Sequence, residues 1–140
     1  MSINRQTVRE AVRRRIISAT GIDPLTQFAE SNRDFNPSGV GLWIREFSIG
    51  GAERTFTSKR SRISSFLLQY DFMIPLNSGT AVLETALDAV AAEFDLADPA
   101  KSCVSASGLD IIVKSISREG ENLKDYRREK LLLTLDVTTG

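Results

Sequence analysis

The sequence contains no histidine and a single cysteine, Cys103, among its 140 residues. One cysteine cannot form a disulfide within the chain, so a secreted scaffold held together by disulfides is excluded. A catalytic thiol usually relies on a histidine as its base, and the sequence provides none. We therefore expect Cys103 to be a buried or half-buried packing residue, because a free cysteine packs as a small hydrophobe.

The chain also lacks net charge and long apolar runs. Lys plus Arg and Asp plus Glu number 18 each, whereas nucleic-acid-binding domains normally carry a basic excess. No apolar run approaches the 18 residues of a membrane-spanning helix, and the N-terminal MSINRQTVREAVRRR lacks the apolar core of a signal peptide. We expect a soluble protein made in a cytoplasm, with no membrane partner. A hydrophobic content of 41% is enough for a real core, and the length fits one domain over residues 1–140.

Motifs for catalysis, cofactors and metals are missing as well. Glu84 and Asp88 share a helix face, but no other segment supplies a nucleophile or an oriented base beside them. The GVG at 39–41 is not followed by the Gly-Lys-Ser/Thr of a phosphate loop, and no D-x-D-x-D-G calcium loop occurs. We therefore predict no catalytic residues, no cofactor and no metal, and a protein that is not an enzyme.

The spacing of apolar residues predicts two helices and four strands. Helical spacing covers 5–19 and 80–95. Strand patterns cover 41–49, 63–75, 109–117 and 126–138. The predicted order is helix, strand, strand, helix, strand, strand. This order favours an α+β fold: a two-layer sandwich with a mostly antiparallel four-stranded sheet and both helices packed on one face.

The stretch GGAERTFTSKRSR at 50–62, between the first two strands, is longer than a hairpin needs. Two antiparallel strands can turn within two to five residues, and long loops are mostly functional or disordered. This stretch carries four basic residues and one acid, while the second helix exposes acidic residues. We predict a long hairpin loop that becomes ordered on assembly, against the next copy of the chain or the structure beneath it. The candidate interface residues are Arg54, Phe56, Lys59, Arg60, Arg62, Glu84 and Asp88.

This layout resembles the tail terminator and tail-completion proteins of long-tailed bacteriophages. The shared features are an N-terminal helix of the type TVREAVRRRI, a strand with Trp43 and Arg45, and a long Gly- and Arg-bearing hairpin. The aromatic strand LLQYDFMIP, the helix GTAVLETALDAVAAEF and two C-terminal strands follow. The resemblance covers nearly the whole chain.

The resemblance implies a structural protein of the virion, assembled in the host cytoplasm and located where the tail meets the neck. Such proteins form a ring, typically hexameric, on the end of the tail tube, where they stop tube growth and dock to the head connector. The expected partners are further copies of the chain, the tail tube protein and the head-neck connector protein. DNA is expected to pass through the lumen without specific binding.

Other functions remain open at this point. One is a different virion part: another head–tail connector or completion protein, or a tail-tube subunit. A small enzyme would have only Glu84, Asp88 and Asp71 as candidates. A nucleic-acid-binding module would use the basic residues of the first helix, Arg5, Arg9, Arg13, Arg14 and Arg15, and its binding would weaken steeply with salt.

Overall fold

The computed structural model describes residues 4–30, 34–37, 39–55 and 62–139, with side-chain surroundings described outside 48–63 and 139. Its elements follow in chain order. They are α1 (Arg5–Thr20), β1 (Phe28–Ala29), β2 (Trp43–Thr55), β3 (Arg62–Pro75), α2 (Ala81–Glu93), α3 (Pro99–Ser102), β4 (Cys103–Ala106), β5 (Leu109–Asn122) and β6 (Tyr126–Thr139).

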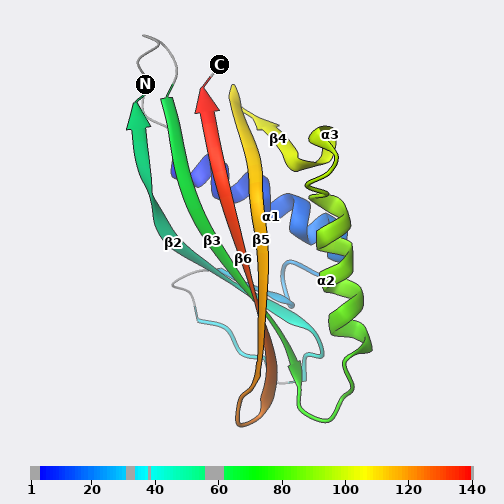
Figure 1. Ribbon diagram of the computed structural model, residues 1–140. Coiled ribbons are helices and arrows are strands. Elements are labelled where there is room, and N and C mark those ends of the chain that lie inside the picture. The colour runs from blue at the N-terminus through cyan, green and yellow to red at the C-terminus, as the bar shows by residue number, and fades with distance from the viewer. Residues whose placement is uncertain (1–3, 31–33, 38, 56–61, 140) are drawn as a thin grey trace.

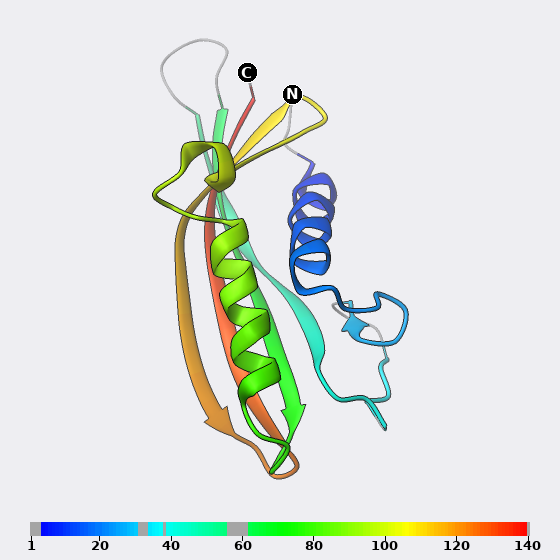
Figure 2. The same cartoon turned by 90° about the vertical axis from the view of Figure 1, so that its right-hand side faces the viewer.

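A six-stranded sheet in the order β1-β2-β3-β6-β5-β4 organises the molecule. The β1–β2 pair is parallel, and the other neighbouring pairs are antiparallel. The four long strands lie side by side and twist strongly along their length, so the sheet is curled (Figure 1). Helix α1 crosses the strands (Figure 1), whereas α2 runs nearly along them (Figure 2).

The four-stranded fold predicted from the sequence is therefore wrong. The sheet has six strands and is mixed, and the described part of the chain holds a third helix. Strand β1 has two residues, β4 has four, and α3 is a single turn of four residues. Elements this short do not produce a readable apolar period. The two long helices and four long strands overlap the ranges that the periodicity predicted, but β2 and β5 run several residues beyond their predicted ends.

Helix α1 shows how the sequence sets the limits of an element. Asn4 is its N-cap, and the side-chain oxygen accepts hydrogen bonds from the backbone N–H of Gln6 at 3.0 Å and of Thr7 at 3.3 Å. Gly21 ends the helix with φ 70°, a left-handed conformation that glycine adopts without strain. The helix buries one apolar stripe, formed by Val8, Val12 and Ile16.

One hydrophobic core joins this stripe to α2 and the sheet. Alternate residues of β3 and β6 point into it, and Leu83, Leu87 and Val90 of α2 cover it. The sheet residues at its centre are Phe66, Leu68, Tyr70, Phe72, Leu131, Leu133, Leu135 and Val137. Because both helices contribute to the same cluster, they cover the same face of the sheet and leave the other face open.

The hairpin between β2 and β3 is not the long loop expected over 50–62. Strand β2 continues to Thr55, and β3 begins at Arg62 and pairs with it. Strand β3 is in turn paired with β6 up to Ile63 and Thr138, so this end of the hairpin belongs to the sheet. A register shift between Ser48 and Gly50 breaks the alternation that strand prediction relies on. That break explains why the strand was expected to end near Ile49.

Candidate assembly surface

The predicted interface residues fall in two places on the molecule. Arg54 lies near the end of β2 and Arg62 begins β3, on adjacent strands at one end of the sheet. Phe56, Lys59 and Arg60 lie outside the described residues. Glu84 and Asp88 lie on α2, which is on the opposite side of the molecule from β2 (Figure 1). The structure therefore keeps the basic and acidic groups apart within one chain. A contact between them would have to form between two copies.

The acidic face of α2 is less free than its sequence suggests. Glu84 accepts hydrogen bonds from Arg118 of β5, with both carboxylate oxygens 3.1 Å from the same guanidinium nitrogen. Glu93 is paired with Arg15 of α1. Asp88 is exposed and has no ion pair with any residue in the described ranges. Of these three acids, Asp88 is the one available to a partner without breaking an internal ion pair.

Arg118 links α2 to the sheet. The same guanidinium also reaches Glu129 of β6, a buried residue, at 3.3 Å. Burial lowers the pKa of Arg118, but the hydrogen bond that Arg118 donates to Glu84 and the charges of Glu84 and Glu129 outweigh it, so the pKa of Arg118 is raised. No local pattern in the sequence indicates this contact, because Glu84, Arg118 and Glu129 come from three different elements.

Two arginines of α1, Arg13 and Arg15, form ion pairs with acids of the same chain. Arg13 donates to Glu46 at 2.6 and 3.1 Å and to Glu30 at 3.1 Å. Arg15 pairs with Glu93 and its guanidinium lies 5.5 Å from the centre of the Phe94 ring. An internal role for these two side chains removes them from the basic surface that a nucleic-acid-binding helix would need.

Glu46 is the fully buried centre of a polar cluster. The Tyr70 hydroxyl donates to the Glu46 carboxylate at 3.2 Å from the neighbouring strand, and Arg13 approaches from α1. Burial of Tyr70, together with the negative charge of Glu46, raises the pKa of the Tyr70 hydroxyl well above its usual value. The hydrogen bond to Glu46 raises the pKa of Arg13 in spite of its partial burial. The strand alternation could have signalled this cluster, because Glu46 shares the inward side with Ile44.

The open face of the sheet carries apolar side chains with no second layer over them in the described part of the chain. Phe47, Gln69, Leu132 and Ser117 form one cross-strand row of this face. Phe47 and Leu132 are half-buried, as is Leu67 in the next row. Antiparallel sheets often expose one face, but that face is then predominantly polar. On this face Phe47, Leu67 and Leu132 are the apolar exceptions, and they are the groups that a partner could cover.

An aromatic cluster closes one end of this open face. The Trp43 ring stacks on Phe35 with centroids 4.9 Å apart and meets Tyr126 edge-on at 6.0 Å. Arg45 lies over the Trp43 ring at 5.7 Å. The Trp–x–Arg pattern of the sequence is therefore a packing feature that holds the loop before β2 against the sheet.

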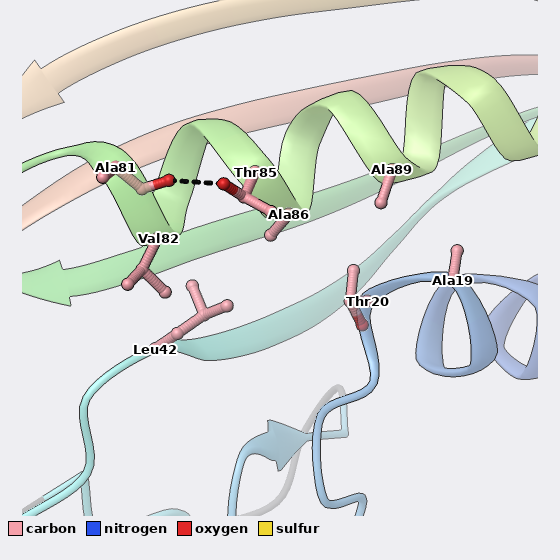
Figure 3. A pocket seen from close by; sticks show the side chains of 8 residues that line it. All are labelled: Ala19, Thr20, Leu42, Ala81, Val82, Thr85, Ala86 and Ala89. Atoms are coloured by element: carbon pink, nitrogen blue, oxygen red, sulfur yellow. Dashed lines mark hydrogen bonds between the residues drawn. The ribbon is translucent and has the colours of Figure 1, made fainter.

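A shallow apolar groove lies between the end of α1 and the first turns of α2 (Figure 3). Its volume is about 310 Å³, and Leu42 and Val82 point toward each other across it. Val82 is 61% exposed, which is unusual for a large apolar side chain on a helix. Within the described residues, no segment of the chain fills this groove.

The described residues offer neither a cluster of metal ligands nor a membrane-spanning helix. They contain no group of three or more His, Cys, Asp or Glu residues placed to hold a metal ion. None of the helices that they form is long and apolar enough to cross a membrane.

Comparison with known proteins gives a fold and no family. No family model and no curated protein matches the chain. A solved structure whose printed name states no function matches 97% of this chain and 96% of its own, with a TM-score of 0.65 and 22% sequence identity. At this identity the similarity shows a shared fold alone. The mixed sheet with helices on one face is thus an architecture that also exists in a solved protein.

Proposed function

We propose that this chain is a structural protein of a long-tailed bacteriophage virion that assembles into a ring, of tail terminator or tail-completion type, on the end of the tail tube. Further copies of the chain, the tail tube protein and the head-neck connector protein are its partners. DNA passes through the lumen of the ring without specific binding.

The observation that carries this proposal is the open, partly apolar face of the sheet. Phe47, Leu67 and Leu132 stay half-buried on a face that no described segment covers. A second copy or another protein seated on this face would remove their remaining apolar surface from water, which favours association. The resemblance of the sequence to phage tail terminator proteins suggests the assembly that could cover them, a ring on the tail tube.

The commitment of the α1 arginines supports an assembly role over a nucleic-acid-binding one. Arg13 and Arg15 neutralise acids of the same chain, so they add little to the attraction for phosphate. A tail-tube subunit or another connector protein would share the open face, and location in the particle distinguishes these possibilities from a terminator.

The experiment is to measure the mass of the purified protein in solution, alone and with tail tubes, and to image the mixture by electron microscopy. We expect a species of several times the 15.4 kDa of one chain, six times for a hexamer, bound at tube ends. Labelling along the whole tube would instead identify a tube subunit. A protein that stays monomeric in both conditions and leaves tube ends bare contradicts the proposal.

A further inference from the structure

Two long strands of the sheet have free edges. Strand β1 pairs with β2 only at Ile44 and Arg45, so residues 46–55 of β2 have no outer neighbour in the described part of the chain. On the other side, β4 pairs with β5 only over 109–112, so the outer edge of residues 113–122 of β5 also has no strand beside it among the described residues. A free edge presents unpaired N–H and C=O groups that can pair with another strand.

The free stretches lie at the same level of the sheet. Following the register across the sheet, Glu46 pairs with Tyr70, Tyr70 with Leu131, and Leu131 with Arg118. In the same way Gly50 is in one row with Ser115. Residues 46–50 of β2 and 115–118 of β5 are therefore opposite ends of the same rows. Beyond these rows the outer edges are occupied: β4 pairs with residues 109–112 of β5 at one end, and β1 pairs with Ile44 and Arg45 of β2 at the other.

The directions of the two strands also match. Strands β2 and β3, β3 and β6, and β6 and β5 are all antiparallel, so β2 and β5 run in opposite directions. If a second copy is placed beside the first with the same end up, its β5 meets β2 antiparallel. Rotation about one axis then continues the alternation from copy to copy, which is the head-to-tail contact that closes a ring.

The composition of the β2 edge favours pairing. Exposed edges are usually protected by charges or proline, but the six residues 47–52, FSIGGA, contain neither. Both strands carry a register shift near this level, between Ser48 and Gly50 and between Val113 and Ser115. Such bulges bend strands and are frequent at the rims of barrels, so they fit sheets that curve around an axis. Bulges can also protect an edge strand from pairing. The experiments below distinguish an edge that pairs from an edge that is protected.

We infer that copies of this chain join through their sheets, with residues 46–50 of β2 forming an antiparallel ladder with residues 115–118 of β5 in the next copy. This inference rests on the proposed ring and specifies its contact. The ladder supplies backbone hydrogen bonds and fixes the angle between copies, and it places half-buried Phe47 beside Ser117 of the next copy on the same face of the joined sheet.

Cysteine cross-linking tests the register. In a Cys103→Ser background, Phe47→Cys is combined in turn with Ser115→Cys, Ser117→Cys or Glu119→Cys. Within one chain residues 47 and 117 are three strands apart, roughly 14 Å, which is too far for a disulfide. Oxidation of the Phe47→Cys/Ser117→Cys protein should therefore give a ladder of covalent oligomers on a denaturing gel, and each single variant should give none.

A proline substitution tests the hydrogen bonds themselves. The Ile44 N–H donates to Gln27 on the β1 side at 2.9 Å, and strand alternation places the Ser48 N–H on the same outer side. Ser48→Pro should leave the monomer folded by circular dichroism and abolish rings, whereas Ser48→Ala should keep them. The inferred ladder is wrong if rings persist in Ser48→Pro, or if rings form but none of the three cysteine pairs gives a cross-link. Either result leaves the ring proposal standing. Absence of rings in the unmodified protein, with tubes present, overturns both.

Discussion

At the scale of single residues, the buried Arg13–Glu46 pair should dominate stability. Arg13→Met leaves the fully buried Glu46 carboxylate without its ion-pair partner. We expect a loss of about 3–5 kcal/mol in the free energy of unfolding, measured by urea denaturation. The double variant Arg13→Met/Glu46→Gln should recover most of this loss, because no charge then remains buried.

The neighbouring Arg14 provides the matched control, because it is exposed. Arg14→Met should change the free energy of unfolding by no more than about 0.5 kcal/mol. Equal losses at both positions would show that α1 responds to any lost arginine, and that the buried pair has no special place in the stability of the protein.

Tyr70 should lower the stability of the folded protein at alkaline pH. Its pKa in the folded state is raised well above the 10.0 of a free tyrosine, mainly by burial. Above about pH 10 the unfolded chain therefore loses this proton while the folded chain keeps it, so stability falls as the pH rises. Tyr70→Phe should be less stable at pH 7, because Glu46 loses a hydrogen bond, and its stability should decline less between pH 10 and 11. Tyr126→Phe, a half-buried control, should keep the steeper decline of the unmodified protein.

At the scale of the elements, the caps of the two long helices differ. Asn4 accepts two backbone hydrogen bonds at the start of α1, whereas the Thr80 side chain makes no capping bond at the start of α2. Asn4→Ala should lower the free energy of unfolding by about 1 kcal/mol, and Thr80→Ala by a few tenths. Thermal and urea unfolding of both variants would measure the difference. A larger loss at Thr80 would contradict this assignment of the caps.

The same contrast shows what the sequence could and could not predict. Asn4, Gly21 and the stripe from Val8 to Ile16 are local signals, and the helix they define is present. Strand β1 is two residues long and is fixed by a parallel neighbour more than a dozen residues away, so no local period reveals it. The sheet order likewise depends on pairing at long range, which periodicity does not report.

The candidate interface was harder to predict, for a related reason. The acids of α2 formed a clear pattern, but Arg15 and Arg118, which pair with Glu93 and Glu84, come from distant elements. A charge that looks free in a sequence can be paired in the fold. The hairpin at 50–55 looked like a loop because glycines and a bulge interrupt its alternation, although its backbone is in the sheet.

At the scale of the whole molecule, the inferred edge pairing would place the basic hairpin near an acid that the sequence did not single out. The end of the β2–β3 hairpin and helix α2 lie on opposite sides of the molecule (Figure 1). The register nevertheless puts Arg54 of the hairpin at the level of Asp110 at the start of β5, through Ile63 and Thr138. If the edges pair in the same rows, the hairpin of one copy comes nearer to the exposed Asp110 of the next than to Asp88.

Charge reversal at the hairpin tests this arrangement. Arg60→Glu/Arg62→Glu should abolish rings in sizing and electron microscopy while the monomer remains folded, because like charges then face each other across the contact. Adding Asp110→Lys to the same chain should restore rings, and adding Asp88→Lys should not. Rings of the unmodified protein should also weaken as salt rises and the Debye length shortens. Arg14→Glu is the control for a change of net charge. Normal rings in the hairpin variant would show that the basic hairpin is not part of the contact, and rescue by Asp88→Lys instead would place α2 against it.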